Sequence, residues 1–183
     1  KEAIILNFKT ETNKFASSFF KVNNHYQTII GKNTFNILSF EKTTYQPGLV
    51  NKIKTINKNN NTLYSDTETV IPAEFFNIFS LLYYLKITPF VDVKSNIKLE
   101  REGLLYNCII KKIENDSNYI YELTFDLITK NQLSVIKNTD MFTWAIFKEN
   151  SHKKIIVDKN NNQIKSCEFT FGLTSLEAHL KNY

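Results

Sequence analysis

Glycine, proline, methionine and arginine are scarce in this chain of 183 residues. It holds four glycines, three prolines and one methionine, and Arg101 is its only arginine among 23 basic residues. The glycines are scattered and frame neither a serine nor a phosphate-binding loop, so serine hydrolases and nucleotide-binding proteins lose their usual sequence support. Scarce arginine argues against specific nucleic-acid recognition, because bidentate contacts to bases and phosphates favour the guanidinium group.

Long apolar runs are also absent. No stretch approaches the roughly 20 apolar residues that a membrane-spanning helix needs, so we expect no transmembrane segment in this chain. The sequence starts at Lys1 without an initiator methionine, which fits a chain whose export signal was removed and equally fits a trimmed chain. Whether a signal or a lipid anchor precedes Lys1 stays open.

Cysteine is rare enough to exclude a disulfide framework. Cys108 and Cys167 permit one disulfide at most, and each shares a strand face with apolar or aromatic residues. Buried thiols in the core, a single disulfide between the two, and a catalytic thiol remain the three interpretations.

The residues that are abundant indicate a folded, mainly β protein. Hydrophobic residues make up 42%, aromatics 14% and charged residues 22%, which supplies enough apolar surface to offset chain entropy. β-branched and aromatic residues favour strands over helices. The length suits one domain, so we expect a single β-rich domain over residues 1–183.

Clusters of asparagine and glycine recur at hairpin spacing and separate strand-like runs. The clearest alternation lies in Leu104 to Ile113 and Tyr119 to Leu127, which we expect to form a hairpin. Weaker predicted strands include Phe15 to Val22, Val91 to Leu99 and Phe142 to Phe147. Together these runs predict a large antiparallel sheet.

One segment departs from this pattern. Pro72 opens a run with helical spacing of apolar residues that closes at Lys86, and proline is common in the first turn of a helix. A helix over about residues 72–86 that is apolar around most of its circumference must be buried. The predicted fold is therefore a single antiparallel curved sheet or half-open β-barrel, with this one helix packed on it.

Several predicted strands carry apolar residues on both faces, which a sheet with one wet face does not require. A closed, filled core is one interpretation, and a lipid-sized cavity between helix and sheet is the other. The residues expected to line such a groove and bind an apolar ligand are Phe75, Phe79, Leu82, Tyr83, Tyr121, Phe125 and Trp144.

Groups that could carry chemistry are isolated. His25, His152 and His179 are far apart and have no partner at metal-ligand spacing, so we predict no metal site and no cofactor. The carboxylates Glu100, Glu102, Asp126 and Asp140 could pair as in a glycosidase, but we interpret them as solvated surface groups. No catalytic residue is assigned, and we predict that the protein is not an enzyme.

Lysines gather at a few places in the sequence. Lys52, Lys54 and Lys58 share one face of a predicted strand. They could meet anionic lipid headgroups or polyanions, or could keep an exposed strand soluble and block edge pairing, which we favour.

From Asn61 to Tyr183 the sequence resembles a family of exported bacterial proteins of unknown function. Val70-Ile71-Pro72, followed by Phe79 to Lys86, is similar to the family's short helix, with Lys86 in place of the usual arginine. Phe142 to Phe147 resembles its tryptophan-bearing strand, Lys153 to Val157 a following short strand, and Phe171 to Leu180 its closing glycine-containing strand pair. The turn between the last two matched strands, acidic in the family, is only partly acidic here.

This resemblance implies export to the periplasm or cell envelope and a β-rich fold with a packed helix, but no reaction. The resulting hypothesis is a non-enzymatic envelope protein, which could bind an apolar ligand such as an acyl chain. One alternative is a structural or protein-interaction module of the envelope with a fully packed core and an envelope protein as partner. A second is an unrecognised hydrolase of envelope glycans.

Overall fold

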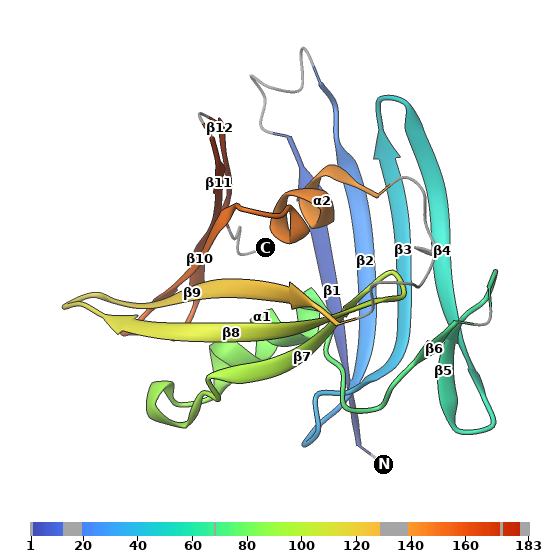
Figure 1. The fold of residues 1–183 in the computed structure, drawn as a ribbon, viewed down its shortest axis with the longest axis horizontal. Coiled ribbons are helices and arrows are strands. Elements are labelled where there is room, and N and C mark those ends of the chain that lie inside the picture. The colour runs from blue at the N-terminus through green and yellow to red at the C-terminus, as the bar shows by residue number, and fades with distance from the viewer. Residues whose placement is uncertain (1, 13–19, 68, 129–138, 173, 180–183) are drawn as a thin grey trace.

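The computed structural model describes residues 2–12, 20–67, 69–128, 139–172 and 174–179. These residues build two six-stranded antiparallel sheets, and in each sheet the strands are neighbours in the order in which the chain makes them. Figure 1 shows that residues 96–127 of the second sheet run at a steep angle to the strands of the first, whereas its last strands turn toward their direction, and that both α-helices lie between the sheets. The predicted mainly β fold with a helix packed on it is confirmed.

Sheet 1 is formed by the first part of the chain. Its strands are β1 (Ala3–Glu11), β2 (Asn23–Gly31), β3 (Ile37–Gln46), β4 (Leu49–Lys58), β5 (Asn61–Tyr64) and β6 (Val70–Ile71). The predicted strand Phe15 to Val22 lies mostly outside the described residues.

Sheet 2 follows after the first helix. Its strands are β7 (Asn96–Arg101), β8 (Leu104–Glu114), β9 (Asn118–Leu127), β10 (His152–Asp158), β11 (Ile164–Phe171) and β12 (Thr174–His179). The helices are α1 (Ile78–Ile87) and α2 (Met141–Phe147), and a 3₁₀ turn, η2 (Phe90–Asp92), separates α1 from β7. The predicted hairpin is confirmed, because β8 pairs with β9.

The two sheets meet where the chain passes from β6 to α1. Phe76 forms a parallel bridge with Leu99 of β7. The Phe76 amide donates to the carbonyl of Lys98 at 2.9 Å, and the Glu100 amide donates to the carbonyl of Phe76 at 2.7 Å. The segment just before α1 therefore pairs with the edge of sheet 2 while β6 belongs to sheet 1.

Helix α1 is shorter than predicted and starts later. The expected start at Pro72 is wrong: Asn77 is the N-cap, and its side chain and that of Ser80 form a reciprocal capping box. Phe76 cannot be helical because its backbone is paired with β7. The helix runs to Ile87, and seven of its ten residues are buried, as the apolar spacing predicted.

The buried position of α1 is fixed by aromatic contacts to sheet 1. The Phe79 ring lies 4.5 Å from the Tyr26 ring and 4.9 Å from the Phe8 ring, measured between centroids. The Asn77 side chain donates to the Thr28 hydroxyl at 3.0 Å. These contacts place the helix against the inner face of β1 and β2, within the same core that lines sheet 2.

The predicted strand Phe142 to Phe147 is wrong, because these residues belong to helix α2. Asp140 caps this helix and accepts from the Thr143 amide at 3.0 Å. Short apolar runs fit a strand or a buried helix equally well, and the cap decides between them. Phe142 contacts Tyr26 of sheet 1 and Phe169 of sheet 2, so α2 joins the two sheets, as Figure 1 shows.

The structure also revises two local expectations. The predicted strand Val91 to Leu99 begins only at Asn96, because Val91 lies in the 3₁₀ turn η2. Cys108 and Cys167 are both buried and free, so the disulfide alternative is wrong. Burial raises the pKa of each thiol to about 12, which does not favour a reactive thiolate.

Neither α1 nor α2 could cross a bilayer, and the same holds for every helical segment of the described chain.

The fold predicts that shortening a buried side chain in the middle of α1 strongly lowers the free energy of unfolding. Leu81 is fully buried, so Leu81→Ala should lower the free energy of unfolding by about 2–5 kcal/mol through lost burial and the cavity left behind. Ile56→Ala removes a similar side chain that is 38% exposed and should cost much less. Urea unfolding of both variants measures the difference, and equal costs would contradict the buried position of α1.

Candidate functional site

A cluster of buried charges lies between the two sheets. The Lys42 ammonium contacts the carboxylates of Glu102 and Asp140, with 3.0 Å between Lys42 Nζ and Asp140 Oδ2. The three side chains are 0–4% exposed. Charges withdrawn from water to this degree are costly unless they are paired and hydrogen-bonded, which makes the cluster the most distinctive polar feature of the core.

Each charge comes from a different element. Lys42 lies on the inner face of β3, directly opposite Tyr26 of β2. Glu102 and Gly103 form the two-residue turn between β7 and β8, and both have positive φ, as the type I′ hairpin turn requires. Asp140 is the N-cap of α2. The cluster therefore ties sheet 1, sheet 2 and α2 together at one point.

The Asp140 carboxylate is fully provided with donors. Besides Lys42, it accepts from the Tyr26 hydroxyl at 2.8 Å, from the Thr143 amide at 3.0 Å and from the Thr143 hydroxyl at 2.7 Å. Burial alone would raise the pKa of Asp140, but the Lys42 charge and these hydrogen bonds outweigh it and lower the pKa. Burial and the nearby carboxylate raise the pKa of Tyr26 well above its usual value, so this phenol stays a neutral donor.

A second buried carboxylate, Glu100, stands beside the cluster. The Tyr64 hydroxyl lies 3.0 Å and 3.1 Å from its two oxygens, and the Gly103 amide donates to it at 3.3 Å. Burial is the main cause that raises the pKa of Glu100 to about 7. Near neutral pH, this side chain therefore exchanges a proton inside the core.

Three of the four carboxylates interpreted as solvated surface groups are buried instead. Glu100, Glu102 and Asp140 lie in the core, and only Asp126 is exposed. Because Lys42, Glu102 and Asp140 are enclosed, a substrate could reach them only if the surrounding elements opened. The geometry suits a connection between elements better than a reaction site.

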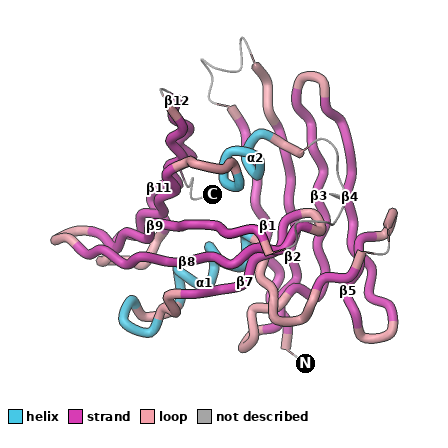
Figure 2. Tube along the Cα trace, viewed as in Figure 1, coloured by secondary structure: helices cyan, strands magenta, loops and turns pink. Residues whose placement is uncertain are grey.

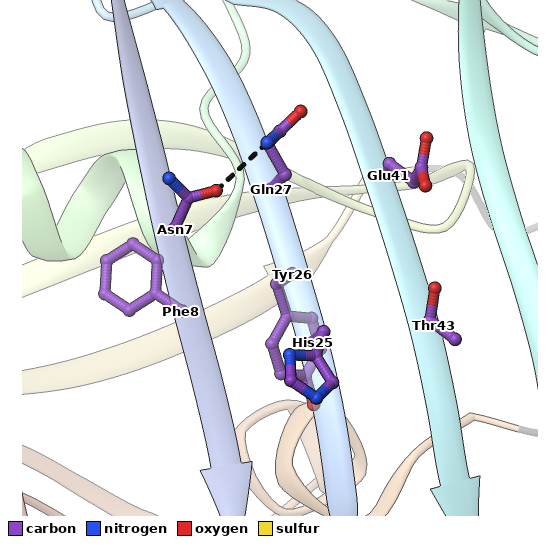
Figure 3. A pocket seen from close by; sticks show the side chains of 7 residues that line it. All are labelled: Asn7, Phe8, His25, Tyr26, Gln27, Glu41 and Thr43. Atoms are coloured by element: carbon purple, nitrogen blue, oxygen red, sulfur yellow. Dashed lines mark hydrogen bonds between the residues drawn. The ribbon is translucent and has the colours of Figure 1, made fainter.

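Two open hollows lie elsewhere, on the outer face of sheet 1. We use this name for the solvent-facing side of β1–β4. One hollow of about 230 Å³ is shown in Figure 3, and its outward-facing side chains are those of Asn7, His25, Gln27, Glu41 and Thr43. Phe8 and Tyr26 also line it, although their rings pack against Phe79 in the core.

The polar groups of this hollow come from three adjacent strands. The Gln27 side chain donates to the Asn7 side chain at 3.0 Å across β1 and β2, as Figure 3 shows. On β3, the Glu41 carboxylate pairs with Lys52 at 2.7 Å, and this hydrogen bond is the main reason that the pKa of Glu41 is lowered. The hollow is thus an open polar surface with an anion already neutralised by lysine.

A larger hollow of about 500 Å³ continues the same face toward the β3–β4 turn. Tyr45 and Val50 oppose each other across this hairpin and are 49% and 73% exposed. The positive φ of Gly48 fits the tight turn that joins their strands. The hollow is lined by Lys21, Asn23, Tyr45, Gln46, Pro47 and Val50.

The seven residues predicted to bind an apolar ligand do not gather around one hollow. Phe75, Phe79, Leu82 and Tyr121 are buried in the core, whereas Tyr83, Phe125 and Trp144 are partly exposed. They pack against different neighbours: Phe79 against sheet 1, Tyr121 against Phe90, Phe125 against Phe147, and Trp144 against Phe171. None of the seven lines either hollow, and their role in binding stays a prediction.

The other candidate groups are at the surface. His25, His152 and His179 are all exposed, and His179 lies 3.3 Å from the Glu177 carboxylate. Lys52, Lys54 and Lys58 are exposed on the same side of β4, as the spacing predicted. Across the described ranges, no three His, Cys, Asp or Glu side chains stand close enough together to hold a metal ion.

Sequence reasoning missed the charge cluster. Lys42 and Glu102 are 60 positions apart, and Lys42 and Asp140 are 98 apart. A lone lysine in an alternating strand gives no sign that it faces inward. The Glu102-Gly103 pair between two strands was the available signal, because it predicts the tight turn that aims Glu102.

No protein-family model, curated protein or solved structure matches this chain. The resemblance to exported bacterial proteins therefore stays a prediction.

We expect the charge cluster to be sensitive to loss of its cation. Lys42→Met leaves two buried carboxylates without their partner and should lower the free energy of unfolding by about 3–5 kcal/mol. The triple variant Lys42→Met with Glu102→Gln and Asp140→Asn should recover much of that loss, since no uncompensated charge remains. Lys52→Met is the exposed control, expected within about 0.5 kcal/mol of the parent. If Lys42→Met lowers the free energy of unfolding no more than Lys52→Met does, the cluster does not hold the sheets together.

The raised pKa of Glu100 predicts a stability that falls with increasing pH. The pKa is 4.5 for an ordinary glutamate and about 7 in the fold, so the folded state holds the proton more tightly. This contribution is complete below the unfolded pKa and is lost as pH rises through the folded pKa, by about 3 kcal/mol at most. Glu100→Gln should remove that loss. Urea unfolding at about pH 5 and about pH 8 compares the two proteins, and parallel behaviour would refute the prediction.

Proposed function

We propose that this protein is a non-enzymatic interaction module of the cell envelope that docks a partner protein on the outer face of sheet 1. The observation that carries the proposal is the division between a filled interior and an open outer face: both hollows lie on β1–β4, and neither is lined by the predicted ligand-binding residues of the core. Assignment to the envelope rests on the resemblance to exported proteins.

The filled interior favours surface recognition over storage of a ligand. Phe79 of α1 packs against Phe8, Tyr26, Phe40 and Phe142, with ring centroids 4.5–6.3 Å apart. An acyl chain between helix and sheet would have to displace these rings, which are already close-packed. The apolar-ligand hypothesis therefore requires an opened form of the protein.

The chemistry of the outer face suits a protein partner with acidic segments. Tyr45 and Val50 offer an exposed apolar pair beside a hollow, and aromatic anchors of this kind dominate many interfaces. Across this face and its rim basic side chains outnumber acidic ones, with Lys9, Lys21, Lys52, Lys54 and Lys58 against Glu11 and Glu41. Such an excess steers and orients an acidic partner.

Site-specific photocrosslinking in cells of the natural host tests the proposal. A photoreactive phenylalanine analogue at Val50 should give one discrete protein adduct, because Val50 is 73% exposed and lines the larger hollow of the proposed surface. The same analogue at Ile109, 45% exposed on sheet 2, is the control. Adducts that are absent at Val50, or identical at both positions, would argue against docking on this face.

Native mass spectrometry of gently purified protein separates the two hypotheses. A bare chain mass fits a filled interior and supports the interaction module. Co-purified lipid that survives Val50→Asp but is lost on substitution in the core would instead support the apolar-ligand hypothesis and overturn the proposed function.

A further inference from the structure

The loop between α1 and β7 holds apolar side chains out in solvent. Val91 is 78% exposed, the highest value among the large apolar residues that the structure describes, and Ile87 is 46% exposed. Pro89 between them is also exposed. Figure 2 shows η2, the short helical piece of this loop, projecting from the body of the molecule. We call residues 86–94 the apolar tip.

The backbone of the apolar tip is fixed in this shape. The amides of Asp92 and Val93 donate back to the carbonyls of Pro89 and Phe90, at 2.9 Å and 3.4 Å. At its end, the Lys94 amide donates to the Tyr84 hydroxyl of α1 at 3.0 Å. The loop is therefore tied to the helix from which it emerges.

Side chains of sheet 2 bind the tip and fix its position. The Lys112 ammonium donates to the carbonyls of Phe90 and Val91, both at 3.0 Å. The Phe90 ring stacks on Tyr119, with centroids 4.5 Å apart and an angle of 13° between the rings. Phe90 thus anchors the turn inward while Val91, its neighbour, is left pointing outward. A protrusion ordered in advance loses little conformational entropy when it binds.

Charge around the tip is mainly positive. Lys86 and Lys94 flank it and Lys112 supports it, whereas Asp92 is the one carboxylate in residues 86–94. The whole chain carries a formal charge of +5. Basic side chains behind exposed apolar ones are the arrangement with which peripheral proteins bind anionic lipid surfaces.

We propose that the apolar tip is a membrane-contact site, which inserts Val91 and Ile87 into the interface of an anionic lipid bilayer while Lys86, Lys94 and Lys112 face the headgroups. A stable protein interface needs a broad complementary surface of several hundred Å² on each partner. A narrow projecting turn with two or three apolar side chains offers little such area, but it suits shallow insertion among headgroups. This proposal is independent of docking on the outer face of sheet 1.

Vesicle co-sedimentation of the purified full chain tests the membrane contact. Binding is expected to vesicles of phosphatidylcholine with about 30% phosphatidylglycerol, and it should weaken in high salt and with phosphatidylcholine alone. Val91→Asp should weaken binding at least about tenfold, because a desolvated charge replaces an inserted apolar side chain. Lys86→Gln with Lys94→Gln should weaken binding only to the anionic vesicles.

The matched control is Val70→Asp, which introduces the same charge at an exposed valine of β6, outside both proposed surfaces, and should leave vesicle binding unchanged. Thermal unfolding of each variant checks that every protein in the comparison is folded. No binding by the parent chain, or equal losses for Val91→Asp and Val70→Asp, would overturn the proposal. If Val91→Asp binds vesicles as well as the parent chain does, the tip is not the lipid contact, and the proposal is overturned as well. Crosslinking at Val50 is unaffected by these outcomes.

Discussion

The buried contact of Lys42 with Glu102 and Asp140 is the constraint on which the arrangement of the two sheets depends. Apolar packing between sheets is tolerant of small shifts, whereas a desolvated ammonium needs its carboxylates at one place. Because the three residues belong to β3, to the β7–β8 turn and to the cap of α2, one interaction sets the position of all three elements. The neighbouring Glu100, able to take up a proton near neutral pH, relieves the local excess of negative charge.

Because the ion cluster and the packed rings fill the space between the sheets, both proposals place recognition on the outer surface. The space between the sheets is occupied by α1, by α2 and by the rings that contact them, and the ion cluster seals one part of it. The surface has two distinct features: a face on β1–β4 rich in amide and lysine side chains, and a projecting apolar turn after α1. The proposed activities are both recognition events, and they use separate surfaces.

The sequence predicted the elements whose signals are local. Alternation located the β8–β9 hairpin, and the apolar spacing of Phe79 to Leu85 located α1 and its burial. It misplaced the start of α1, because Pro72 resembled a first-turn proline while the Asn77–Ser80 cap was not recognised. It predicted a strand in place of α2, because a short, mostly apolar run of seven residues has no decisive period. The charge cluster was not predicted, since Lys42 meets Glu102 and Asp140 only when elements 60 and 98 positions apart lie together. The hollows of sheet 1 were not predicted either, because the strand pattern does not give the shape of the sheet surface.

The plain strand order of both sheets has a consequence for how the chain assembles. Each described strand pairs with its neighbour in sequence, and most of these pairs are joined by short turns with a small entropic cost of closure, although residues 128–151, which include α2, separate β9 from β10. The bridge from Phe76 to Leu99 and the approach of Lys42 to its carboxylates are among the contacts that require both halves. We expect the halves to be ordered first and to associate last, when the ammonium finally leaves water. A newly synthesised chain would then form its two sheets first, and the docking of one sheet on the other would be the slow step.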